Sequence, residues 1–129
     1  MKSTENALNW FEISVSDLAR AKNFYETVFN MEMPQMDMDG VNMAFFPTDD
    51  STGKVGGALA KSDFHKPSTD GTIVYLNANP DLAEALGRIE VAGGSIVLPR
   101  TFVSDAVGYM AMFIDSEGNK VALHSRVEA

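Results

Sequence analysis

Few side-chain types in this chain could do chemistry. The sequence contains no cysteine, which excludes disulfides, thiolate metal ligands and a cysteine nucleophile. It contains two histidines, His65 in a polar stretch and His124 at the end of an apolar run. A histidine beside a carboxylate holds its proton more firmly, which suits general acid catalysis near neutral pH. Any reaction must therefore use carboxylates, these imidazoles, hydroxyl groups or a bound metal.

The carboxylate of Glu12 belongs to a segment, 9–15, whose residues alternate in character. Trp10, Glu12 and Ser14 fall on one face of this segment, and the other face is apolar. An alternation of period two predicts a strand whose apolar side packs against a helix. The indole of Trp10 and the carboxylate of Glu12 are therefore expected to point to the same side of a sheet.

This strand opens a predicted βαβββ unit. Ser16 or Asp17 can cap a helix with a side-chain oxygen, and apolar residues then recur at three- and four-residue spacing from Leu18 to Phe29. Three strands are predicted to follow, at residues 36–38, 41–46 and 55–60.

The second half of the chain predicts the same order of elements. A helix that Asn79 caps is expected from residue 80 or 81 to residue 92, and Gly93-Gly94 ends it because glycine adopts the left-handed conformation cheaply. The expected strands lie at residues 72–78, 95–98, 109–114 and 120–124.

The two halves also repeat short phrases. Met43-Ala44 returns as Met110-Ala111, 67 positions later (110 minus 43), and Lys54-Val55 returns as Lys120-Val121, 66 positions later (120 minus 54). The sequence thus predicts a duplicated module, with repeat 1 at about 8–60 and repeat 2 at about 72–125. A unit of roughly 65 residues is marginal alone, so both repeats are expected to share one domain, 1–129, with function in the concavity between them.

The composition limits the partners and the compartment. A net charge of −8 argues against nucleic acid as a partner, because phosphate binding requires clustered lysine and arginine. The sequence has no apolar run long enough to span a bilayer, and its first nine residues lack the apolar core of a signal peptide. With no cysteine, a cytoplasmic location is the expectation.

Three phrases in this order connect the chain with a known family. They are Val15-Ser16-Asp17-Leu18-Ala19-Arg20-Ala21 leading to Phe24-Tyr25, then Ala92-Gly93-Gly94, and finally Asp115-Ser116-Glu117-Gly118-Asn119. Together they resemble the vicinal oxygen chelate superfamily, which includes glyoxalase I, extradiol dioxygenases, and bleomycin and fosfomycin resistance proteins. The resemblance implies an α+β fold of two tandem βαβββ modules, whose eight strands form a curved mixed sheet shaped as an open cup. It also implies helices on the outer face and commonly a homodimer.

Enzymes of this family hold a divalent metal such as Zn, Ni, Mn or Fe inside the cup. By position, the resemblance places the ligands on Trp10, Ala122, Gly56 or Gly57, and Ile73 or Tyr75. None of these side chains is a good metal ligand. The expectation is therefore a protein without the usual metal, and the alternative is a divalent metal held by Glu12 and His124.

Glu12 and His124 are nevertheless expected to point into the cup, one pleat from the lost ligand positions. They are the candidate catalytic acid–base pair. With Tyr75, Asn77 and possibly Ser14 they can instead form a polar floor that orients a ligand. The structural alternative is a hydrogen-bonded pair that only satisfies two buried polar groups.

The leading functional hypothesis is metal-independent binding of a small, partly apolar molecule. The indole of Trp10 can stack on a planar ligand or simply fill the place of a lost metal ligand, and methionines make adaptable linings. The phenol of Tyr109 can hydrogen-bond a ligand carbonyl. The alternatives are a metal-dependent lyase, isomerase or dioxygenase-like enzyme that uses Glu12 and His124, and a module that binds a protein partner. The predicted ligand-binding residues are Trp10, Glu12, Phe45, Tyr75, Asn77, Tyr109, Met112 and His124.

Overall fold

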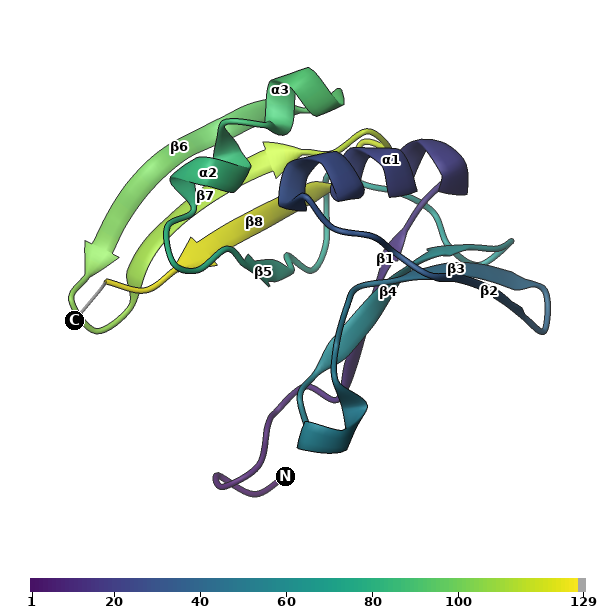
Figure 1. Cartoon of the computed structure of the whole chain (residues 1–129), viewed down its shortest axis with the longest axis horizontal. Helices are drawn as coiled ribbons and strands as arrows, with labels where there is room; N and C mark the ends of the chain where they lie inside the picture. The colour runs from purple at the N-terminus through teal and green to yellow at the C-terminus, as the bar shows by residue number, and fades with distance from the viewer. Residues whose placement is uncertain (128–129) are drawn as a thin grey trace.

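The computed structural model of the chain describes residues 1–127, and it confirms two tandem βαβββ modules (Figure 1). The eight strands are divided between two open four-stranded sheets rather than joined into one. The first sheet has the order β1-β4-β3-β2, with bounds Trp10–Ser14, Gly56–Lys61, Val41–Phe45 and Gln35–Met38. The second has the order β5-β8-β7-β6, with bounds Tyr75–Asn77, Lys120–Ser125, Gly108–Ile114 and Ser95–Ser104.

The pairing of strands is the same in both modules. In each, the first strand runs parallel to the fourth, and the other pairs are antiparallel. Trp10 of β1 lies opposite Gly56 of β4, and Tyr75 of β5 lies opposite Ala122 of β8. β1 and β5 are therefore equivalent strands, and each is an edge of its sheet.

Helix α1, Leu18–Phe29, packs one buried face against both halves of the molecule. Asp17 caps it, because its side chain accepts the N–H of Arg20 at 3.0 Å, as the sequence predicts. Phe24 and Tyr25 of this helix stack against Phe113 of β7, with ring centroids 5.9 and 6.4 Å away. The two modules thus share one apolar core.

The second helix differs from the prediction in its start and its continuity. It forms two short pieces, α2 at Ala83–Leu86 and α3 at Ile89–Ala92, which are separated at Gly87-Arg88. Glycine weakens a helix, and the guanidinium of Arg88 instead donates to the carbonyl of Val28 near the end of α1. Gly93 ends α3 with a φ of 108°, as expected.

The expected cap of this helix is also wrong. Asn79 accepts the backbone N–H of Arg126, while Asp81 accepts the N–H of Ala83 and the hydroxyl of Ser125 accepts the N–H of Leu82. Asp81 acts locally, whereas the contact between Leu82 and Ser125 joins positions 43 apart, so local spacing could not reveal it.

Three other boundaries differ from the sequence analysis. β5 is limited to three residues, β6 extends to Ser104, and a single turn of 3-10 helix, Asp50–Thr52, lies between β3 and β4. β6 is long because it pairs with β7 along its length, with shifts in register that strand patterning cannot show.

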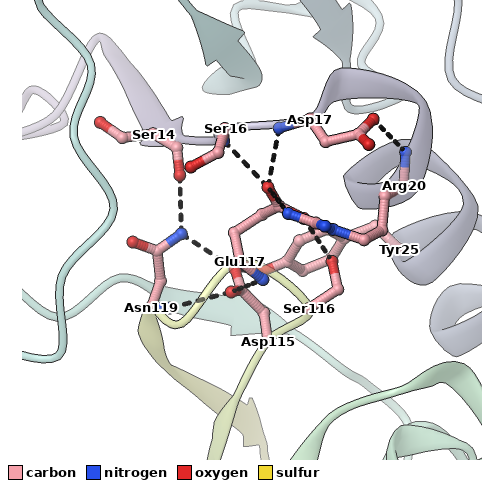
Figure 2. A network of polar contacts seen from close by, with 9 residues as sticks. All are labelled: Ser14, Ser16, Asp17, Arg20, Tyr25, Asp115, Ser116, Glu117 and Asn119. Carbon is pink, nitrogen blue, oxygen red and sulfur yellow. Dashed lines mark hydrogen bonds and ion pairs between the residues drawn. The ribbon is translucent and has the colours of Figure 1, made fainter.

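A polar network ties the second module to the start of α1 (Figure 2). Glu117, between β7 and β8, accepts the backbone N–H groups of Ser16 and Asp17, both at 2.9 Å. Arg20 donates to both of its carboxylate oxygens, at 2.7 and 3.0 Å. The turn of one module therefore satisfies the helix N-terminus of the other.

Asn119 extends this network to the strand that carries Glu12. Its amide nitrogen donates to the carbonyl of Ser14, at the end of β1, at 2.7 Å, and its amide oxygen accepts the N–H of Ser68 at 3.0 Å. The contact with Ser14 thus fixes β1 relative to the second sheet (Figure 2), and the contact with Ser68 fixes the connection between the modules.

Candidate functional site

A cleft of about 1200 Å³ lies between the edge strands β1 and β5. Four of the predicted ligand-binding residues line it, namely Trp10, Glu12, Tyr75 and Asn77. Apolar side chains, including Phe29, Met31 and Phe46, complete much of the wall, and Asp49 and Lys54 add one charge of each sign. The cleft is therefore mainly apolar with a few polar groups, as small-molecule sites usually are.

Trp10 presents much of its indole to solvent, with 42% of the residue exposed. Its ring leans on Phe45 with a centroid distance of 6.0 Å. Its Nε1–H donates to Oε2 of Glu12 at 3.2 Å. The indole is thus oriented by an aromatic neighbour and by the carboxylate two residues along the strand.

Glu12 receives a second donor from the connection between the modules. Nε2 of His65 lies 2.7 Å from Oε1 of Glu12, and only 16% of the histidine side chain is exposed. Because an ionised carboxylate can only accept, Nε2 carries a hydrogen in this pair. The other ring nitrogen, Nδ1, lies 2.5 Å from the hydroxyl of Ser62. Both nitrogens of His65 are therefore engaged, and the imidazole is held in one orientation.

The expected pairing of Glu12 with His124 is not formed. Nε2 of His124 instead lies 2.6 Å from the carbonyl of Val107, in the turn between β6 and β7. Strand alternation predicted the face of each side chain but not its partner, because the partners come from loops. His124 is opposite Asn77 in the register of β8 and β5 and stays near the cleft without lining it.

Tyr75 and Asn77 occupy the β5 side of the cleft. Tyr75 is 51% exposed. The amide oxygen of Asn77 accepts the backbone N–H of Asn79 at 2.9 Å, so its amide hydrogens remain as donors for another group.

The other predicted ligand-binding residues lie outside the lining of this cleft. Tyr109 carries the guanidinium of Arg100 3.7 Å above its ring and packs edge-on against Phe102. Met112 of β7 lies opposite Ala122 of β8. Phe45 contacts the ring of Trp10, which does line the cleft.

The residues present do not fit the metal of the family. The positions that the resemblance assigns to ligands hold Trp10, Ala122, Gly56 or Gly57, and Ile73 or Tyr75. In the sheets, Trp10 lies opposite Gly56 and Tyr75 lies opposite Ala122. Among the side chains that the structure describes, those of histidine, aspartate and glutamate form no group of three that could hold an ion. The donor set therefore supports no metal-dependent step.

The sequence favours an exposed loop position for His65, with a flap over the cup as the alternative, and it does not single out Ser62. The contact between His65 and Glu12 spans 53 positions, and neither spacing nor periodicity relates a loop residue to a strand residue. The available signal was that His65 is one of two histidines in the chain.

The fold and the cleft define a member of a superfamily of paired βαβββ modules, and sequence comparison names it. The chain belongs to the Glyoxalase/Bleomycin resistance protein/Dioxygenase superfamily, whose model matches residues 7–123. No curated protein sequence matches the chain. Among the described residues, none of the helices combines the length and apolar character that crossing a bilayer requires.

Solved structures share the fold. A glyoxalase/bleomycin resistance protein from Albidiferax ferrireducens T118 is 20% identical, with a TM-score of 0.66, 94% of this chain covered and 100% of that chain. A family enzyme from Burkholderia phytofirmans PsJN is 14% identical, with a TM-score of 0.66 and coverages of 95% and 100%. Glyoxalase I from Zea mays is 19% identical, with a TM-score of 0.66; the match covers 95% of this chain but 45% of the maize chain.

Proposed function

We propose that this protein binds a small, partly apolar molecule in the cleft between β1 and β5, without the divalent metal of its family. The convergence of Trp10, Glu12, Tyr75 and Asn77 on one cleft supports this most directly. Small-molecule sites usually measure about 300–1000 Å³, so a cleft of about 1200 Å³ has room for such a ligand. The oriented carboxylate of Glu12 would fix the polar end of the ligand.

A thermal-shift screen of small aromatic and aliphatic compounds tests this function. A compound present at about 100 times its dissociation constant adds about 2.7 kcal/mol to the free energy of unfolding. We expect Trp10→Leu to lose most of the shift and Phe102→Leu, an exposed aromatic residue of β6 outside the cleft, to keep it. The proposal fails if no compound shifts the wild type, or if the hits shift Trp10→Leu equally.

A proton-transfer enzyme is the second candidate function. The observation that favours it is the pair of donors on Glu12, since Trp10 and His65 hold its two oxygens in one orientation beside the cleft. A positioned carboxylate can serve as a general base toward a bound carbon acid. Exchange of α-protons of carbonyl compounds in deuterated water, followed by NMR, would reveal this activity. Loss of exchange in Glu12→Gln is expected if the candidate is correct, and exchange that persists in this variant contradicts it.

The metal-independent part of the proposal has its own test. Protein purified without chelator should contain no stoichiometric zinc, nickel, manganese or iron by elemental analysis. The positions of Trp10, Gly56, Tyr75 and Ala122 provide no good metal ligand, which supports this expectation. Stoichiometric metal that disappears in both Glu12→Ala and His124→Ala would establish the metal-dependent alternative instead.

The protein is also proposed to be a cytoplasmic homodimer. The lack of cysteine supports the compartment, and the exposed apolar residues of both sheets, such as Met36, Met38 and Val97, support self-association. Light scattering coupled to gel filtration should give twice the mass of 14.0 kDa. A single-chain mass at every concentration would contradict the dimer.

A further inference from the structure

The two modules place aromatic residues at equivalent strand positions, and both residues line the same cleft. Trp10 is opposite Gly56 in the pairing of β1 with β4, and Tyr75 is opposite Ala122 in the pairing of β5 with β8. Each aromatic residue has a strand neighbour with little or no side chain, so no bulky group covers its ring from that neighbour. Both rings are about half exposed, and both line the same cleft.

The positions two residues further along are also equivalent and are polar. Glu12 lies opposite Ala58, and Asn77 lies opposite His124. Glu12 offers only acceptor oxygens, because an ionised carboxylate carries no hydrogen, and Trp10 and His65 leave part of its acceptor capacity unused. Asn77 offers its amide hydrogens, since its oxygen accepts from Asn79. The duplication has thus produced two stacking surfaces with an anionic acceptor at one edge and a neutral donor at the other.

We infer that the cleft takes a flat, cationic nitrogen heteroaromatic ring, which stacks on Trp10 and Tyr75 and donates to Glu12. This inference rests on the proposed binding function and names its ligand class. Electron-rich aromatic faces attract cations, and the attraction is stronger for tryptophan and tyrosine than for aliphatic walls. The other charged residues of the lining are Lys54 and Asp49. Their formal charges cancel, so they do not favour an anion.

His65 is a positioning residue in this arrangement. It holds one oxygen of Glu12 at 2.7 Å, while Trp10 holds the other at 3.2 Å. The lone pairs of the carboxylate that these donors do not use are then available to the ligand in a fixed direction. Ser62 fixes the imidazole in turn through Nδ1.

Three bicyclic probes of similar size separate shape from charge. 4-Aminoquinoline is flat and cationic, decahydroquinoline is saturated and cationic, and quinoline-4-carboxylate is flat and anionic. Calorimetry gives their dissociation constants, and the indole N–H resonance of Trp10 reports the site, since the chain has one tryptophan. Stacking of a ring on an aromatic side chain corresponds to roughly five- to 150-fold in affinity, so 4-aminoquinoline should bind at least about tenfold more tightly than the saturated probe.

Matched variants assign the effect to residues. Trp10→Leu and Tyr75→Leu should each weaken binding of 4-aminoquinoline by about fivefold or more, and Phe102→Leu should leave it unchanged. Glu12→Gln should reduce the preference for 4-aminoquinoline over quinoline-4-carboxylate. Melting temperatures show whether each variant is folded, and Tyr75→Leu keeps the Trp10 signal if Trp10→Leu does not fold.

The outcomes distinguish this inference from the proposed function. Equal binding of the saturated probe, or tighter binding of the carboxylate, overturns the inference while the protein still binds a small molecule. If none of the three probes binds but compounds from the thermal-shift screen do, the ligand class is wrong and the function stands. If neither the probes nor the screen gives binding at Trp10, both fail.

Discussion

Tyr25 illustrates how a single polar residue is accommodated inside the core. Its phenol is fully buried on α1, and its hydroxyl donates to Oδ2 of Asp115 at 2.7 Å (Figure 2). Burial raises the pKa of Tyr25 well above 10.0, and the negative charge of Asp115 adds to this effect. The neutral phenol is therefore the form that the folded protein requires.

Tyr25→Phe removes this hydrogen bond without changing the shape of the ring. Asp115 keeps three other donors, from the backbone of Glu117 and from Asn119, so the loss should be about 1.5 kcal/mol, typical of a hydrogen bond to a charged group. Urea denaturation measures it. Tyr75→Phe, at the half-exposed position in the cleft, is the control and should change stability by less.

The same residue predicts a loss of stability in alkali. Because the pKa is raised in the folded state, the stabilisation is complete below the ordinary tyrosine value of 10.0 and is lost as the pH rises above it. Urea titrations between neutral pH and pH about 11 should show a steeper fall for the wild type than for Tyr25→Phe. Identical slopes would mean that Tyr25 ionises equally in both states.

Elements of one module depend on turns of the other. The N-terminus of α1 is satisfied by Glu117, whose side chain is fully covered, and Arg20 completes the contact from the solvent side (Figure 2). Burial alone would raise the pKa of Glu117. The hydrogen bonds from Arg20 and from the backbone of Asp17 and Ser16 outweigh burial and hold the pKa below its ordinary value of 4.5.

Glu117→Gln should therefore change the acid limb of the stability profile. A lowered folded-state pKa gives stability that is present above pH 4.5 and is lost as the pH falls through the folded value. At neutral pH we expect a loss of about 1–2 kcal/mol, because the charge-assisted hydrogen bonds weaken. Thermal denaturation from pH 7 to pH 3 checks both effects. Glu90→Gln, an exposed glutamate of α3, should alter neither.

The glycine pair after α3 shows a second dependence between elements. A Cβ on Gly94 would lie 2.6 Å from the carbonyl oxygen of Ile114 and 2.8 Å from the ring of Phe24. The segment can therefore pass close to β7 and α1 only without a side chain. Sequence reasoning identified Gly93-Gly94 as a helix stop, and packing gives the second glycine a further reason.

Gly94→Ala should lower the free energy of unfolding by about 1–3 kcal/mol, the usual cost of forcing extra volume into a packed site. Chemical denaturation measures this, and Ser95→Ala, at the neighbouring exposed position, serves as the control. Unchanged stability in Gly94→Ala would show that β7 and α1 move apart at little cost.

The whole molecule is held together by a core that both modules supply. Phe24 and Tyr25 from the first module stack against Phe113 from the second, and the network around Glu117 and Asn119 joins the same two halves. Helix α1 covers the first sheet and packs against α2, α3 and Phe113 of the second module, so its buried face is shared by both halves. The two modules should consequently unfold together.

A single transition in urea is the expected outcome. The fluorescence of Trp10 reports the first module, and far-ultraviolet circular dichroism sums both, so the two curves should coincide. A fluorescence transition at lower urea would show that β1 separates before the second sheet unfolds.

The sequence by itself predicted the duplication and most of the elements, because helix and strand periods, caps and glycine stops are local properties. Asp17 caps α1 and Gly93 ends α3 as expected. It also placed Trp10 and Glu12 on one face, since alternation along a strand depends only on the backbone. The same reasoning brought Tyr75 and Asn77 to the site, where the structure places them along one cleft.

Only the tertiary structure decided the partners of these residues. Glu12 pairs with His65 rather than His124, and His124 lies against the carbonyl of Val107. The N–H of Leu82, at the start of α2, donates to the hydroxyl of Ser125. Each of these contacts joins segments separated by 17 to 53 positions. Periodicity fixes the direction of a side chain from its own strand, whereas its partner depends on how loops and sheets come together in space.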